Sequence, residues 1–425
     1  MQLIQRLRSH SFFGVLVNFF NLSVFQGAGI VLQFLAIPLI THKYGIAVFG
    51  QTVLASSFAV FMGGITNYGT HQTAIKEVAT AKGNLSYLSA LFYKVLFFRS
   101  YAFLLTIPAV LLMWVLYPSI GWWLWLSTLP LILAEVFNPL YFLIGVQKIA
   151  FISWGNLVVK LLSLVALFFI PLGSNIAASI TLIMGLPVLL YYIVLTVVIT
   201  KNQRLVFTNP SKSSLLDLAK QNFYIMFNGV AVALQQSIFL FTLAGFVSAQ
   251  TLGAYGLVDK LVGAVRQLVS SFSNALYPRA AILYNQNVND WTSFKAQVNK
   301  GYSVVFGIMC VVILIGAPQI VWLLTGQSLN SNQALNTIYF MRLFALVPLV
   351  IALNANNVLT LLLQNKYVAL FYISVLILVA TALLSVCIIF TGSTALVGWY
   401  PLFIETICLC IYTYFFTCGD FRKAW

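Results

Sequence analysis

The sequence predicts an all-α membrane protein with about 12 transmembrane helices. Only 7% of its 425 residues are charged and 61% are hydrophobic, whereas soluble domains carry about 25% charged residues. Apolar runs long enough to span a bilayer, roughly 17–25 residues each, recur along the whole chain. These observations exclude a soluble fold.

We expect twelve spans. They lie at 14–40, 49–72, 92–116, 121–144, 150–171, 176–200, 221–247, 252–280, 301–325, 334–362, 367–391 and 394–417. These runs are continuous, whereas the strands of outer-membrane barrels alternate apolar and polar residues over about ten positions. Helices are therefore the better interpretation. The basic start MQLIQRLRSH leads into an apolar run that is too long for a signal peptide, so we expect a retained first helix.

The lysines and arginines outside the spans fall almost entirely on one side of the membrane. With twelve spans, sixteen lysines and arginines fall on one side and only Lys43 falls on the other. The positive-inside rule then places both termini in the cytoplasm. A net charge of +15 would suggest nucleic acid for a soluble protein, but here the charge follows the topology and no nucleic-acid partner is expected.

The chain divides into two weakly similar halves. The longest polar break follows six spans, so we expect an N-terminal six-helix bundle at 1–200, a cytoplasmic linker at 201–220 and a C-terminal six-helix bundle at 221–425. The segments NFFNLSVFQGAGIVLQFLAIPLI and NFYIMFNGVAVALQQSIFLFTL begin the two halves. Because six is an even number of helices, both halves enter the membrane from the same side. The two halves are then related by an axis along the membrane normal, as in several transporter folds.

A few charges lie inside the predicted spans. The cations are Arg99, Lys160, Lys260, Arg266 and Arg342, and the anions are Glu135, Asp259 and Glu405. A charge at the bilayer centre costs about 2.5–3.5 kcal/mol, so such residues usually face a bundle interior or an aqueous cavity. Arg99 lies near a cytoplasmic end and is expected to extend to the interface, and Lys260 either does the same or joins a site.

The span 252–280 carries its polar residues on one face. At about 100° per residue a narrow stripe forms, made of Gly256, Asp259, Gly263, Arg266, Ser270 and Asn274. The amides of this and other spans either bond helices together or contact a ligand. The excess of cations over anions in the spans favours binding of an anionic group such as a phosphate. The amide side chains and the aromatic residues, which make up 15% of the chain, favour binding of sugar hydroxyls and rings.

Signatures of enzymes and metal sites are absent from the sequence. No P-loop occurs, and the histidines His10, His42 and His71 show no metal spacing. The five cysteines, at 310, 387, 408, 410 and 418, lie in or beside helices, so they indicate apolar packing residues and no disulfide framework. The exported loops are too short for a glycan-processing site. We therefore expect no catalytic residues, no metal and no cofactor.

Three stretches resemble a known family. They are ITNYGTHQTAIKEVATAKGN (65–84), PLYFLIGVQKIAFISWGNLVVKLLS (139–163) and VSAQTLGAYGLVDKLVGAVRQLVSSFSNALYPRAAIL (247–283). All three are similar to segments of the Wzx-type polysaccharide-repeat flippases, a branch of the multidrug/oligosaccharidyl-lipid/polysaccharide exporter superfamily. The resemblance implies two six-helix bundles around a central cavity. It also implies flipping of undecaprenyl-diphosphate-linked oligosaccharides to the periplasmic leaflet by alternating access, for O-antigen-like surface polysaccharide.

This resemblance gives the intramembrane charges expected roles. The expected cavity residues are Arg266, Arg342, Lys160, Asp259, Lys260 and Asn274, and the residues expected to pair with them or to carry a coupling ion are Glu135, Asp259 and Glu405. The expected partners are the lipid-linked oligosaccharide, membrane lipid, and polymerase and chain-length proteins. Two alternatives stay open: a cation-coupled small-molecule exporter, and a membrane polymerase or ligase of glycans.

Overall fold

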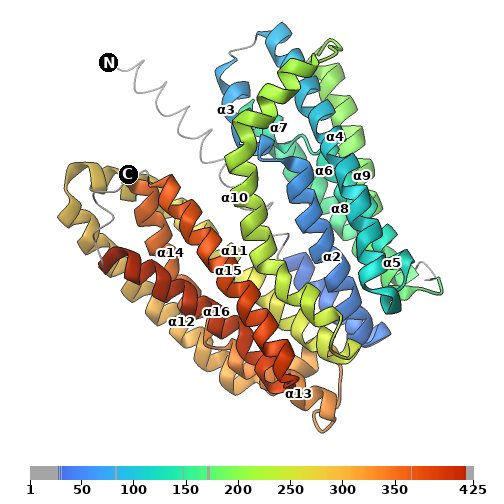
Figure 1. Ribbon diagram of the computed structural model, residues 1–425, viewed down its shortest axis with the longest axis vertical. Helices are drawn as coiled ribbons and strands as arrows, with labels where there is room; N and C mark the ends of the chain where they lie inside the picture. The colour runs from blue at the N-terminus through green and yellow to red at the C-terminus, as the bar shows by residue number, and fades with distance from the viewer. Residues whose placement is uncertain are drawn as a thin grey trace. The chain divides into compact units, whose positions relative to one another are not determined.

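The computed structural model describes residues 27, 29, 31–81, 84–146, 148–169, 173–364 and 366–417. Every regular element in this part of the chain is a helix, and no strand occurs in it (Figure 1). In a bilayer the backbone groups must be satisfied internally, and a helix achieves this within one segment. The prediction of an all-α membrane protein is confirmed.

Nine segments of the described chain are long and apolar enough to cross a membrane. They are Ile46–Asn67, Leu85–Leu116, Trp122–Gly145, Ile176–Asn202, Lys212–Ala244, Asn289–Thr325, Asn332–Leu363, Val368–Thr391 and Thr394–Phe415. Of the other expected spans, 150–171 corresponds to the shorter apolar helix Ser153–Phe169, and 252–280 lies within the long helix α11 (Ala249–Gln286). The expected first span, 14–40, lies largely outside the described residues.

The chain forms two compact units whose bounds differ from the expected ones. Unit 1 contains the residues up to Ala36 together with Ala55–Ala233, and unit 2 contains Ile37–Leu54 together with Leu234–Trp425. Two helices, α2 (Ile46–Asn67) and α10 (Lys212–Ala244), therefore each contribute to both units. The division into six-helix bundles at 1–200 and 221–425 stays a prediction.

The expected linker 201–220 is shorter than its sequence suggests. Helix α9 (Ile176–Asn202) ends at Asn202 and α10 begins at Lys212, so only residues 203–211 lie between the two helices. The hydroxyl of Ser211 accepts a bond from the backbone N–H of Ser214 at 3.3 Å and so stabilises the start of α10. Leu218 is buried. The polar stretch is thus the amphipathic first part of a helix.

Two breaks shape unit 1. Its remaining elements are α3 (Thr70–Thr80), α4 (Leu85–Leu116), η1 (Pro118–Ile120), α5 (Trp122–Leu126), α6 (Leu129–Phe137), α7 (Leu140–Gly145) and α8 (Ile149–Phe169). Between α2 and α3, Tyr68 and Gly69 have φ values of 51° and 72°. Between α6 and α7, Pro139 lacks the N–H that would continue the helix. Both breaks leave backbone carbonyls without helical partners.

Unit 2 is built around α14. Its elements after α11 are α12 (Val288–Thr325), α13 (Asn332–Phe344), α14 (Val347–Leu363), α15 (Tyr367–Thr391) and α16 (Thr394–Thr417). Helix α14 packs against α11, α12 and α16. The start of α11 touches α2 so closely that a Cβ on Gly253 would lie 2.0 Å from the carbonyl oxygen of Ile46. Only glycine fits there.

Candidate functional site

The candidate site in unit 2 is built on an ion pair between α11 and α16. Arg266 donates from Nε to Glu405 Oε1 at 3.0 Å and from Nη2 to the same oxygen at 2.5 Å. The side chains are 27% and 9% exposed, respectively. One cation and one anion that the sequence placed inside the spans are thus bound to each other.

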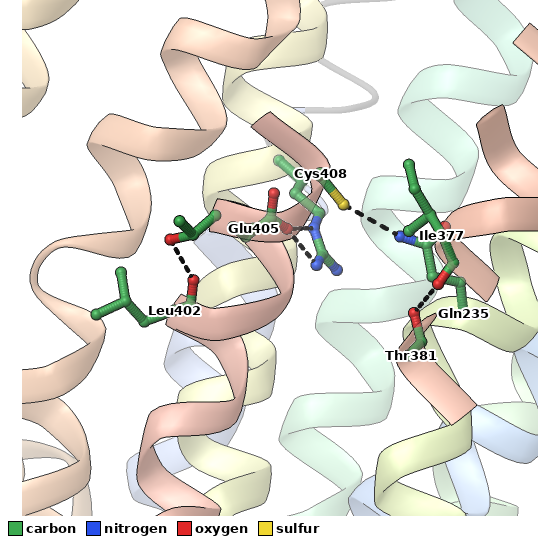
Figure 2. A network of polar contacts seen from close by, with 8 residues as sticks. Gln235, Ile377, Thr381, Leu402, Glu405 and Cys408 are labelled. Atoms are coloured by element: carbon green, nitrogen blue, oxygen red, sulfur yellow. Dashed lines mark hydrogen bonds and ion pairs between the residues drawn. The ribbon is translucent and has the colours of Figure 1, made fainter. Parts of the chain in front are cut away.

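A polar contact from a third helix lies beside this pair. Cys408 stands one turn after Glu405 on α16, and Figure 2 shows its sulfur directed towards Gln235 of α10. Gln235 Nε2 lies 3.8 Å from Cys408 Sγ. Helices α10, α11 and α16 therefore meet at the ion pair, and Cys408 is buried, as a packing cysteine should be.

Buried aromatic rings lie within electrostatic range of the charges of this site. The rings of Phe239 and Tyr400 stack with centroids 3.6 Å apart, and Tyr255 stands edge-on to Phe239 at 5.0 Å. All three residues are buried. An apolar surrounding of this kind strengthens the interaction between the charges and penalises a charge that loses its partner.

Asp259 lies on the same helix as Arg266, about 10 Å away along the axis. Both Asp259 and Lys260 are partly buried, and neither has an ion-pair partner within 4.0 Å among the described residues. Asp259 still lies within electrostatic range of Arg266. Residues of the stripe predicted on this helix therefore contact different neighbours: Gly256 packs against Val53, whereas Arg266 binds Glu405.

Each of the other predicted residues has its own local surroundings. Lys160, on α8 of unit 1, has its Nζ 3.4 Å from the position that a Cβ on Gly29 would occupy. Arg342 is exposed in the last turn of α13. Glu135 of α6 accepts a bond from Asn138 Nδ2 at 3.1 Å. The side chain of Asn274 lies outside the described residues. Within unit 2 the structure places Arg266 against Glu405, with Asp259 within electrostatic range of Arg266.

Arg99 corrects one expectation. We predicted that it extends to the membrane interface, but its side chain is 0% exposed. Its Nη1 donates to the carbonyls of Glu135 at 3.1 Å and Asn138 at 2.8 Å, at the break between α6 and α7. Its Nε donates to Thr70 Oγ1 at 2.8 Å, at the other break. The two helix breaks supply the acceptors that make burial of this charge possible.

The surroundings of Arg99 extend to an aromatic ring and a histidine. The guanidinium carbon lies 5.0 Å from the centroid of the Tyr141 ring. His71 follows in α3, beyond the candidate span α2, and burial together with the positive charge of Arg99 lowers its pKa to about 4. Sequence reasoning missed this centre, although Gly69 and Pro139 both signal breaks that leave acceptors open.

The described residues contain no group of three or more His, Cys, Asp or Glu side chains that could hold a metal ion. What they contain is a cation–carboxylate pair, Arg266 with Glu405, and the buried Arg99. An arginine with part of its surface exposed can bind phosphate or carboxylate oxygens. The arrangement is therefore one for recognising an anionic group or for exchanging ion-pair partners.

Comparison with known proteins shows the family to which the chain belongs. Residues 15–283, well over half of the chain, match the family described as "Polysaccharide biosynthesis protein". A protein of Escherichia coli (strain K12) named "Putative O-antigen transporter" is 22% identical over 395 residues, which cover 89% of each chain.

Solved structures show the same fold. An inward-facing multidrug resistance transporter of the MATE family, in the MOP superfamily, matches with a TM-score of 0.71 at 13% identity and covers 92% of this chain and 98% of its own. The lipid II flippase MurJ, in an inward closed conformation, matches with a TM-score of 0.69 at 11% identity and covers 93% and 87%. The chain thus has the fold of these transporters and is a multi-pass membrane protein.

Proposed function

Because the chain belongs to the polysaccharide biosynthesis protein family, we propose that it is a flippase for lipid-linked oligosaccharides. It moves undecaprenyl-diphosphate-linked repeat units from the cytoplasmic to the periplasmic leaflet by alternating access, for O-antigen-like surface polysaccharide. The observation that carries the proposal is the relative named as an O-antigen transporter, which aligns over 89% of both chains. The transporter fold supports the same conclusion.

The proposed location is the bacterial inner membrane, with both termini in the cytoplasm. The support is the charge asymmetry of the loops, because lysine and arginine accumulate on the cytoplasmic side of membrane proteins. In this orientation the lipid-linked substrate is loaded from the side where it is assembled. Polymerase and chain-length proteins are its proposed partners on the other side.

In this proposal the intramembrane cations handle the diphosphate. Arg266, Arg342 and Lys160 contact phosphate or acidic sugar oxygens, Lys260 adds charge beside them, and Asn274 contributes an amide. The ion pair gives Arg266 a specific role, because its Nε and Nη2 are bound to Glu405 before substrate arrives. An arriving phosphate competes with Glu405 for the guanidinium, and the released carboxylate is free to take up a proton.

The acidic residues are then the coupling candidates. Glu405 exchanges between the guanidinium and a proton, and Asp259 lies on the same helix within range of Arg266. Glu135 belongs to unit 1 and is bound to Asn138, so it serves as a separate pairing or coupling group. This chemistry needs no covalent step, and we propose a transporter and not an enzyme.

The test is the leaflet in which the lipid-linked oligosaccharide accumulates when the gene is deleted. An impermeant probe is applied to right-side-out and to inverted membrane vesicles. Complete repeat units confined to the cytoplasmic face are the expected result. Unpolymerised units on the periplasmic face would instead indicate a polymerase or ligase, and normal processing would indicate an exporter of small molecules.

A further inference from the structure

A second polar cluster joins α12 and α14 in unit 2. Lys295 donates from Nζ to Asn357 Oδ1 at 3.1 Å, and Asn356 donates from Nδ2 to Asn299 Oδ1 at 2.5 Å. These residues lie on other helices than Arg266 and Glu405. One ammonium and three amides are thus held together by side-chain bonds between two helices.

Two amide oxygens of α14 have no hydrogen-bond partner in the described part of the chain. They belong to Asn354, which is 9% exposed, and Asn356, which is 0% exposed. A buried acceptor without a donor costs about 1–3 kcal/mol. Leucine would fill either position without this cost. The two oxygens are therefore open acceptors that a donor from outside the chain can use.

An aromatic residue continues the cluster along α12. Trp291, Lys295 and Asn299 are spaced four residues apart, which places them on one face of the helix. The Trp291 ring packs with Leu359 and Leu363 of α14. Its Nε1–H is also buried without a partner in the described residues. The cluster thus offers unused acceptors and an unused donor beside an apolar surface.

We propose that this cluster binds a sugar ring of the transported molecule. It consists of Trp291, Lys295, Asn299, Asn354, Asn356 and Asn357. Sugar hydroxyls both donate and accept, so they can bond the two asparagine oxygens and also accept from an indole N–H or an ammonium. Small-ligand sites typically combine apolar walls with a few converging polar groups of this kind.

The inference rests on the proposed function and deepens it. It assigns recognition of the glycan to α12 and α14, and recognition of the diphosphate to the charges described above. In the predicted topology the connection between the expected spans 252–280 and 301–325 lies on the cytoplasmic side, so Trp291, Lys295 and Asn299 stand at the side from which substrate enters in the proposed function. The ligand class is a hydroxylated sugar linked through diphosphate to a polyprenyl chain.

The test measures the affinity of the purified full-length protein for two lipids. One is the lipid-linked repeat unit extracted from the deletion strain, and the other is undecaprenyl diphosphate without sugar. We expect the wild type to bind the repeat unit more tightly. Asn354→Leu removes an unpaired oxygen, so its melting temperature without ligand should stay equal or rise. Its affinity for the repeat unit should fall about tenfold, the loss expected for one good hydrogen bond, while its affinity for the sugar-free lipid stays unchanged.

Asn228→Leu is the matched control, because Asn228 also has a buried amide oxygen without a partner in the described residues but lies on α10. This control should keep both affinities. Asn356→Leu tests the second oxygen in the same way. If Asn354→Leu lowers the melting temperature and keeps the preference for the repeat unit, the cluster only packs helices and the proposal fails. Equal binding of both lipids by the wild type overturns the sugar site alone, and binding of neither overturns the flippase as well.

Discussion

Arg266 and Glu405 form an ion pair in which Nε and Nη2 of the arginine donate to the same carboxylate oxygen, at 3.0 and 2.5 Å. Glu405 is the more deeply buried partner, with 9% of its side chain exposed. Removing the arginine alone therefore leaves a buried carboxylate without its counter-ion. A loss of transport in such a variant would mix a local effect with a loss of folded protein.

The first prediction separates these two effects. Arg266→Met alone should destabilise the protein by about 2 kcal/mol, below the 3–5 kcal/mol of a fully buried pair because Arg266 is partly exposed. The double variant Arg266→Met/Glu405→Leu should recover most of this stability, since apolar replacement of a buried pair is often neutral. Melting in detergent and the amount of surface polysaccharide check the two parts.

If Arg266 contacts substrate, the double variant should be abundant and still fail to export polysaccharide. Normal polysaccharide from a stable double variant would remove the pair from the proposed site. Arg266→Lys is the complementary variant, because it keeps the charge and loses the two-pronged geometry. We expect it to retain partial export.

The sequence could predict that Arg266 needs a partner but not which one. Three carboxylates lie within the apolar spans, and helix periodicity places Asp259 on the same face as Arg266. The structure selects Glu405 because α11 and α16 lie side by side, and that choice depends on tertiary packing. The helical spans themselves are predictable, since a continuous apolar run inside a membrane can satisfy its own backbone hydrogen bonds only as a helix.

For Arg99 the sequence suggests the wrong environment. Its position in the chain suggests a side chain that reaches the interface, yet it is fully buried. The acceptors come from the start of α3 and from α6 with its C-cap residue, which are distant in sequence and meet only in the folded unit. The bounds of the two compact units likewise depend on tertiary packing, because α2 and α10 each run through both units and no polar break marks the crossing.

The second prediction concerns this buried arginine. Arg99→Met should destabilise unit 1 by about 3 kcal/mol or more, because two carbonyls and the Thr70 hydroxyl lose their donor in a buried place. Arg99→Lys should recover part of the loss. The control is Arg204→Met, which changes an exposed arginine and should leave the melting temperature within a degree or so of wild type. Equal effects of the two methionine variants would contradict the role assigned to Arg99.

The third prediction compares two glycines of α11. A Cβ on Gly253 would lie 2.0 Å from a backbone oxygen of α2, whereas a Cβ on Gly263 would meet no atom within 4 Å. Gly253→Ala should therefore force the helices apart and cost about 1–3 kcal/mol. Gly263→Ala should be neutral or stabilise by up to about 1 kcal/mol through helix propensity. Thermal melting of both variants in one detergent tests the close crossing, and a neutral Gly253→Ala would refute it.

The fourth prediction is a pH dependence of stability that comes from His71. Burial and the charge of Arg99 lower the pKa of His71 to about 4 in the folded protein, while an unfolded histidine titrates near 6.5. Between these values the unfolded chain binds a proton that the folded chain does not, so folding stability falls as the pH decreases from about 6.5 towards 4. The slope from one such group is at most about 1.4 kcal/mol per pH unit.

Other acidic groups also titrate in this range, so the measurement is the difference between wild type and His71→Gln. Melting temperatures of the two proteins at pH 7.5 and pH 5 should show a smaller drop for His71→Gln. An equal drop in both would mean that His71 is protonated in the folded state and that Arg99 does not act on it.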